Sequence, residues 1–212
     1  MEKLHVAVIE LPPLPTNSYI IHNRTQAVVI DPGGIPDSVA LYLTGSHLTL
    51  THILLTHLHS DHTVGAGPLS GAFGAPVYAS EKDAWMLDDY LGKGDDDWGI
   101  PPVPRFSFEH LSAGPLGMLD SACTVLETPG HSPGGLSFYF ESIAAVFAGD
   151  TLFRRTTGRT DFSGGDPERI SASLRNILFR LPEATRVFPG HGPSFLLGES
   201  LAFKQFSEHR SG

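Results

Sequence analysis

The segment Thr-His-Leu-His-Ser-Asp-His at residues 56–62 places three histidines and one aspartate within six positions, directly after an apolar run. If the chain is extended there, His57 and His59 point to the same side, because side chains alternate along a strand. A turn after them lets Asp61 and His62 present ligands from another direction. Imidazole nitrogens and carboxylate oxygens bind zinc at about 2.0–2.2 Å. Since the whole chain has only 11 histidines, this density predicts a site for one or two metal ions.

Three later segments each place one potential ligand beside glycine, just after an apolar strand. His131 follows the run 124–128, Asp150 follows 144–148, and His191 follows 187–188. Glycine lets the backbone approach closely and aim such a side chain into a shared cleft. Alone, His131 or His191 is more often an ordinary loop histidine. With the first motif they make seven ligands, enough for two metals that share one carboxylate.

Short apolar strands outnumber helices along the chain. The predicted strands are Leu4–Ile9, Ser18–His22, Gln26–Ile30, Ile53–Thr56, Pro76–Ala79, Thr124–Thr128, Leu136–Phe140, Ala144–Ala148 and Val187–Phe188. The clearest helix begins after Asp166 as N-cap and carries an apolar stripe to Leu181. Another runs from Ser80 to about residue 91, with Asp83 completing a weak capping box, and a third covers 199–209. Two groups of strands flanked by helices favour a layered α/β architecture with two sheets.

Composition narrows the class of protein. The length fits one large domain over residues 1–212, and a net charge of −9 lacks the basic footprint of a nucleic-acid binder. No stretch approaches the ~18 apolar residues of a membrane span, and the N-terminus lacks a secretory pattern. One cysteine, Cys123, excludes an internal disulfide, suits a reducing cytoplasm and is expected to be buried. The acidic segment 88–97 is expected to be a solvated loop.

The order of these ligands resembles the metallo-β-lactamase superfamily, from the Thr16–Tyr19 turn to Gly190–Pro193. Gly149–Phe153 and Gly158–Phe162 are similar to short bacterial members of its glyoxalase II-like branch. The resemblance implies an αββα sandwich of two mixed β-sheets flanked by helices, with the metals at one edge. Its ligand pattern assigns the first metal to His57, His59 and His131, the second to Asp61, His62 and His191, and Asp150 to both. Two divalent ions are implied, zinc first, with iron or manganese as alternatives.

The activity implied is hydrolysis of a small acyl thioester, a hydroxyacylglutathione first. Two cations that share Asp150 lower the pKa of a water between them, and the resulting hydroxide attacks the thioester carbonyl. Asp61 and Asp150 are then the catalytic carboxylates. The thiolate leaves readily, so no Ser–His or Cys–His pair is needed. β-Lactamases with a cysteine ligand are excluded, because Cys123 matches no ligand position.

Two further residues receive alternative interpretations. Arg159 matches the position of a glutathione-binding lysine in the family, and it either grips a substrate carboxylate or forms an ion pair with Asp161. Asp31 ends a strand as Asp150 does, and it either accepts the second N–H of a metal-bound histidine or caps a turn. Full-length glyoxalase II proteins carry a helical C-terminal extension that contacts glutathione, and we expect this chain to lack it.

Two other functions remain open. A mononuclear Fe(II) persulfide dioxygenase of the same superfamily would use His57, His131 and Asp150, the facial arrangement of non-haem iron oxygenases. A metal-binding module without activity is the third hypothesis, and the complete ligand set disfavours it. The oligomeric state is not indicated by the sequence.

Overall fold

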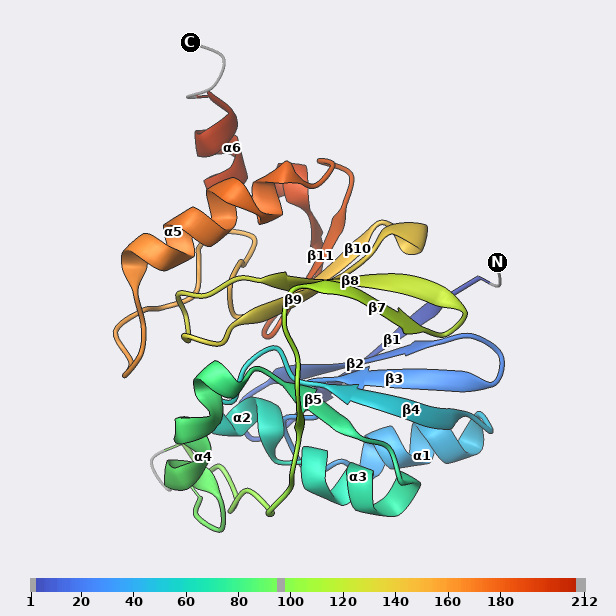
Figure 1. Ribbon diagram of the computed structural model, residues 1–212. Coiled ribbons are helices and arrows are strands. Elements are labelled where there is room, and N and C mark those ends of the chain that lie inside the picture. The colour runs from blue at the N-terminus through green and yellow to red at the C-terminus, as the bar shows by residue number, and fades with distance from the viewer. Residues whose placement is uncertain (1–2, 95–97, 209–212) are drawn as a thin grey trace.

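Two six-stranded sheets lie face to face in the computed structural model, which describes residues 3–94 and 98–208 (Figure 1). The first sheet has the order β1-β2-β3-β4-β5-β6, with antiparallel pairs up to β3 and parallel pairs from β3 onward. Its strands are β1 (His5–Leu11), β2 (Thr16–His22), β3 (Gln26–Ile30), β4 (Thr49–Leu54), β5 (Val77–Ala79) and β6 (Glu109–His110). Both antiparallel and parallel neighbours occur, so the first sheet is mixed.

The second sheet has the order β12-β11-β10-β9-β8-β7, and only its β10–β11 pair is parallel. Its strands are β7 (Gly114–Met118), β8 (Ser121–Glu127), β9 (Leu136–Phe140), β10 (Ala145–Gly149), β11 (Arg186–Pro189) and β12 (Phe195–Leu196). The helices are α1 (Asp37–Gly45), α2 (Ser60–Thr63), α3 (Ala66–Phe73), α4 (Ala84–Tyr90), α5 (Pro167–Asn176) and α6 (Leu201–Glu208). Four 3-10 turns are η1 (Glu81–Asp83), η2 (Glu141–Ile143), η3 (Leu178–Arg180) and η4 (Leu197–Glu199).

Alternate side chains of β3 explain the layering. Val28 and Ile30 point into the core between the sheets, where they join Phe138 and Phe147 of the second sheet. Val29 points the other way, into the core that α1 and α3 share with the first sheet. Because strand side chains alternate between faces, one strand that is apolar on both faces is covered on both sides.

A third core completes the sandwich on the outer face of the second sheet. Ile170 and Leu174 of α5 pack there with Val146 of β10 and Val187 of β11. In Figure 1, α5 and α6 lie over the second sheet, and α1 and α3 lie under the first. The fold is therefore the αββα sandwich that the sequence predicts.

The predicted strands are found with shifts of at most a few residues, and the helices required more correction. Asp166 is the N-cap of α5, and its carboxylate accepts the Glu168 and Arg169 amides, but the helix ends at Asn176. The predicted helix from Ser80 divides into η1 and α4, and the last one begins at Leu201 rather than at 199. The acidic segment 88–97 is not all loop, since α4 continues to residue 90; residues 95–97 lie outside the described part.

Three helices (α1, α2 and α3) and three short strands (β6, β7 and β12) had no prediction. Helix α3 contains Gly67, Pro68 and Gly71, residue types that disfavour helices. It forms because Ala66 and Leu69 are buried against the first sheet. Tertiary packing thus overrides weak local propensity, which no local pattern reveals. No helix among residues 3–94 and 98–208 is long and apolar enough to cross a membrane.

Cys123 lies on β8 in the core between the sheets with none of its surface exposed, as expected. Burial raises the pKa of its thiol to about 12. We therefore expect DTNB at pH 8 to label the native protein no faster than it unfolds, and to label one thiol at once in denaturant. Complete labelling of the native protein within minutes would contradict this placement.

Candidate metal centre

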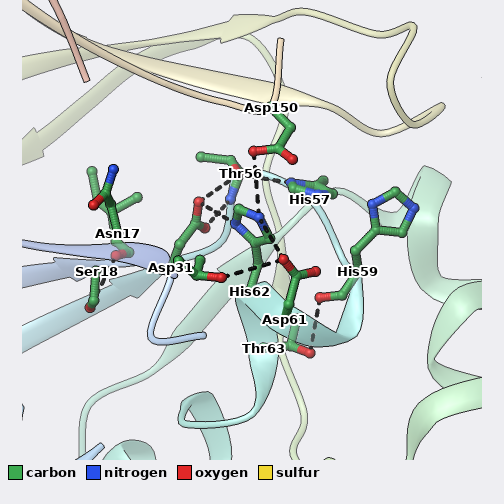
Figure 2. A network of polar contacts seen from close by, with 12 residues as sticks. Asn17, Ser18, Asp31, Thr56, His57, His59, Asp61, His62, Thr63 and Asp150 are labelled. Atoms are coloured by element: carbon green, nitrogen blue, oxygen red, sulfur yellow. Dashed lines mark hydrogen bonds and ion pairs between the residues drawn. The ribbon is translucent and has the colours of Figure 1, made fainter. Parts of the chain in front are cut away.

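The chain leaves β4 at Leu54 and delivers the first ligands within a few residues. His57 follows in the loop, and His59 is the N-cap of α2 with an extended backbone. Asp61 and His62 lie inside α2, one turn further on. Figure 2 shows these side chains gathered above α2, with Asp150 reaching them from the opposite sheet.

The second sheet supplies the remaining ligands from three strand ends. His131 lies in the loop that joins β8 to β9, Asp150 follows β10, and His191 follows β11. Because β10 and β11 are parallel, their carboxyl ends reach the same edge. Gly190 makes the approach possible, since a Cβ there would lie 2.0 Å from Asp150 Oδ1.

All seven side chains selected from the sequence meet at this edge. Nδ1 of His59 lies 3.0 Å from Nε2 of His131. Nε2 of His62 lies 3.6 Å from one oxygen each of Asp61 and Asp150. Nε2 of His191 lies 3.2 Å and 3.6 Å from the same two carboxylates. Three groups have ligand atoms within 4.8 Å of one another: His57–His59–His131, His57–His62–Asp150 and Asp61–His62–His191.

Hydrogen bonds on the outer side fix the orientation of four of the imidazoles. Nδ1 of His131 donates to the carbonyl of Arg159 at 2.8 Å, and Nδ1 of His191 donates to the carbonyl of Pro15 at 2.9 Å. A carbonyl can only accept, so Nδ1 of each ring carries a proton and Nε2 is the nitrogen that faces the centre. Nδ1 of His57 lies 3.0 Å from the Thr56 hydroxyl. The fourth imidazole is that of His62, whose outer partner is Asp31.

Asp31 orients two of these rings at once. Its carboxylate lies 3.0 Å from Nδ1 of His62 and accepts both the amide and the hydroxyl of Thr56, at 2.8 and 2.7 Å. The same hydroxyl contacts His57. The aspartate has a φ of 50°, a left-handed conformation that aspartate tolerates better than most residues. Asp31 thus makes the contact with Nδ1 of His62 that its interpretation as a hydrogen-bond acceptor requires.

The inner side of the site is short of partners. Among the described side chains, Nε2 of His57, Nε2 of His62 and Oδ1 of Asp150 are buried with no hydrogen-bond partner. Leaving such a group unsatisfied costs about 1–3 kcal/mol. Three such atoms facing one another, two imidazole nitrogens and one carboxylate oxygen, fit a cation between them. The donor set of imidazoles and carboxylates suits zinc, iron or manganese.

The pKa values divide the metal-free cluster into neutral and charged members. Burial lowers the pKa of His59 to about 3, with help from His131, and holds that of His57 well below its usual value. Burial opposes charge on His62 too, but the carboxylates led by Asp61 raise its pKa to about 10. Neutral His57 and His59 are ready to bind a metal, and His62 carries a proton that a cation would displace.

Arg159 lies at the mouth of the site and is paired. Its guanidinium forms two hydrogen bonds of 2.6 Å with the Asp161 carboxylate, and both side chains are more than half exposed. The guanidinium also lies 3.9 Å from the ring centre of Phe162, whose edge approaches His59. The structure thus shows the ion pair, one of the two interpretations of Arg159.

Several supporting residues escaped the sequence analysis. The Asn17 amide donates to the carbonyls of Pro189 and Gly192, and the Tyr19 hydroxyl also donates to Pro189. This part of β2 therefore holds the loop that carries His191, and it ties one sheet to the other. Thr56 also supports a ligand, since its hydroxyl contacts His57. Its position directly before His57 is the only local sequence signal for any of these supporting residues. The partners of the others are about 170 residues away.

Family comparison agrees with this site. The model of the metallo-β-lactamase superfamily matches residues 11–191, so the chain belongs to that superfamily. A probable metallo-hydrolase of Streptococcus pyogenes is 40% identical over 84% of this chain and 79% of its own length. Hydroxyacylglutathione hydrolase GloC of Haemophilus influenzae is 30% identical over 92% of this chain and 93% of its own length.

Three solved structures have the same fold. BLEG-1, a B3 metallo-β-lactamase, has a TM-score of 0.84 at 35% identity, covering 92% of this chain and 95% of its own. TTHA1623 in a di-iron-bound form has a TM-score of 0.80 at 38% identity, and the match covers 92% of this chain and 96% of its own. ETHE1 from Myxococcus xanthus has a TM-score of 0.70 at 28% identity, and the match covers 92% of this chain and 80% of its own. The class of protein is therefore a metallo-hydrolase-type enzyme of this superfamily.

Replacing Asp31 by asparagine should weaken metal binding, since partners on the outer side of a ligand histidine typically contribute 10–100-fold in metal affinity. We expect a loss of that size, measured by chelator competition. Asp37→Asn is the matched control, because Asp37 is exposed at the start of α1. Equal metal affinities in the two variants would show that Asp31 does not support the metal ligands.

Stability of the metal-free protein should peak near neutral pH. Folded His62 has a raised pKa, so its contribution is complete below about pH 6.5 and is lost as the pH rises toward 10. Folded His57 and His59 have lowered pKa values, so their contribution is present above pH 6.5 and is lost toward pH 3. Urea unfolding between pH 5 and 10 measures both limbs, and His59→Gln should flatten the acid limb. Stability that rises steadily to pH 10 would contradict the assignment.

Proposed function

We propose that this protein hydrolyses a small acyl thioester, a hydroxyacylglutathione first, with two divalent cations held by the seven ligands. The observation that carries the proposal is the set of unpartnered buried atoms on His57, His62 and Asp150, which face one another. Similarity to a hydroxyacylglutathione hydrolase over nearly the whole chain supports this choice of substrate.

Two groups of residues would hold the metals. His57, His59 and His131 form the first, and Asp61, His62 and His191 form the second. Asp150 stands between them, with one oxygen 3.6 Å from Nε2 of His62 and the other 3.8 Å from Nε2 of His131. When bound, such cations polarise a carbonyl and lower the pKa of a water toward neutrality. Zinc is our first choice, and iron is the alternative that a di-iron relative suggests.

The protein's own groups then orient the reactants. The Asp61 carboxylate accepts a hydrogen bond from the Thr16 hydroxyl at 3.4 Å and lies 3.2 Å from Nε2 of His191, and in this orientation it would accept the proton of an attacking water. Asp150 faces the same point from the second sheet. The leaving thiolate has an ordinary pKa near 8.5, so the site needs no strong acid beside the sulfur.

Phe162 and Arg159 form the rim on the side of the first group. Phe162 is 41% exposed, and the centre of its ring lies 5.6 Å from the centre of the His59 ring. We propose that Arg159 exchanges Asp161 for a glutathione carboxylate when substrate binds, because both members of the pair face solvent and are easily separated.

Substitutions in this pair test the exchange. Arg159→Ala should raise KM for a hydroxyacylglutathione about five- to thirtyfold and leave kcat within a few-fold, the pattern of lost uniform binding. Asp161→Asn should lower KM, since the guanidinium is then free. A simple acyl thioester without carboxylates is the control substrate and should respond to neither change. An equal effect on both substrates would show that Arg159 stabilises its loop and does not bind the substrate carboxylate.

Asp150→Ala tests the shared carboxylate. We expect loss of turnover and of metal content, with the far-UV circular dichroism spectrum retained because the sheets carry the fold. Retention of more than about a tenth of kcat, a barrier change below ~1.4 kcal/mol, would be inconsistent with a ligand shared by both metals.

The second candidate function is that of a mononuclear iron persulfide dioxygenase. The specific observation in its favour is that His57, His131 and Asp150 lie together at the site, and ETHE1 is a structural relative. Metal analysis of the isolated protein separates the candidates: two metals per chain with thioester turnover favour hydrolysis. One iron per chain, with oxygen consumed on addition of glutathione persulfide and no thioester turnover, would show that the protein is the dioxygenase and not the hydrolase. Nitrocefin in the same assay tests β-lactam hydrolysis, the activity named for BLEG-1.

A further inference from the structure

Asp83 is a fully buried carboxylate that belongs to none of the three ligand groups. The sequence places it in a weak capping box with Ser80. In the structure the Ser80 hydroxyl does accept the Lys82 amide, but the Asp83 side chain turns away from the helix end and into the protein. A buried carboxylate costs free energy unless its oxygens accept hydrogen bonds, so its partners indicate what it does.

Those partners come from two other segments of the chain. The Ser132 hydroxyl donates to one Asp83 oxygen at 2.6 Å, and the Gly134 amide donates to the other at 2.6 Å. The Leu58 amide also approaches this carboxylate and acts to lower its pKa, which burial raises. Each bond to a charged acceptor is roughly twice as strong as a neutral one.

The three donors stand beside the histidines of the first ligand group. Leu58 lies between His57 and His59, and Ser132 directly follows His131. One carboxylate therefore joins the loop after β4 in the first sheet to the loop after β8 in the second. The imidazoles of His59 and His131 face each other across these loops, with Nδ1 of His59 3.0 Å from Nε2 of His131.

The fit around Asp83 is close. A Cβ on Gly134 would lie 2.7 Å from the Asp83 carboxyl carbon and 2.9 Å from Cβ of Ser80. Only glycine lets the backbone amide at this position come within hydrogen-bonding distance of the carboxylate. The hydrogen bond between Gly134 and Asp83 therefore depends on the absence of a side chain at residue 134 as well as on the position of the carboxylate.

We propose that Asp83 is a positioning residue that holds His57, His59 and His131 in register for the first metal. Ligand distances in zinc sites vary by only about 0.2 Å, so the two loops must be fixed to that tolerance before an ion arrives. The inference rests on the proposed metal site. It does not depend on which substrate the enzyme uses.

The second group has separate supports, which makes the proposal selective. Asp31 holds His62, and the Pro15 carbonyl holds His191. Neither contacts Asp83. Loss of Asp83 should therefore weaken one metal of the two.

The test is Asp83→Asn, in which an amide of the same size offers one acceptor oxygen instead of two. We expect the affinity of one metal to fall 10–100-fold and that of the other to stay within about threefold, measured by chelator competition. Amide hydrogen exchange of the metal-free protein should be faster at Leu58 and Gly134. Ser132→Ala removes one of the two 2.6 Å bonds to Asp83 and should give a smaller loss with the same selectivity.

Asn23→Ala is the matched control for a merely structural effect. Asn23 is also buried and accepts two backbone amides, those of Thr25 and Gln26, in the β2–β3 turn. This turn lies at the end of β3 away from Asp31. The variant should lose stability and keep both metal affinities.

Three outcomes would overturn the proposal: unchanged metal affinities in Asp83→Asn, an equal loss of both metals, or the same pattern in Asn23→Ala. If Asp83→Asn does not fold, Ser132→Ala decides by the same criterion. Since every measurement is made without substrate, failure of the wild-type protein to hydrolyse a thioester leaves this result standing and overturns only the proposed substrate.

Discussion

Much of this structure follows from the need to satisfy polar groups that are buried where the edges of two sheets meet. Four of the five imidazoles of the centre have one nitrogen bound on the outside, by a carboxylate, hydroxyl or carbonyl, and one directed inward. The inward atoms of His57, His62 and Asp150 have no protein partner. The outer bonds keep these atoms facing one another at a cost that an ion can offset. A centre of this kind is prepared before the metal arrives.

The sandwich provides the rigidity that such a centre requires. The core between the sheets includes three aromatic rings in contact, with Phe147 stacked on Phe188 at 4.8 Å and Tyr19 meeting both edge-on. The Tyr19 hydroxyl then reaches the backbone of Pro189, two residues before His191. Core packing and ligand placement are therefore linked through one side chain, and close packing transmits little freedom to the site.

Close approach of backbone is the other device that brings the two sheets together. Gly149, with a φ of 47°, passes Thr56 so closely that a Cβ would lie 2.3 Å from its hydroxyl. Gly190 approaches Asp150 in the same way. The glycines seen beside each ligand in the sequence thus have a definite use. They allow segments from different sheets to share a volume that side chains would otherwise fill.

The sequence by itself determined the kind of site and most of the fold. The density of histidine after an apolar strand, and the single ligands at later strand ends, selected all seven residues that meet at the centre, because ligand chemistry depends on residue type and strand periodicity is local. Tertiary structure decided the rest. It formed α3 from residues that disfavour helices, paired Arg159 with Asp161, and turned Asp83 from a helix cap toward Ser132 and Gly134. Those outcomes depend on neighbours distant in the chain, whose positions are set only when both sheets have packed.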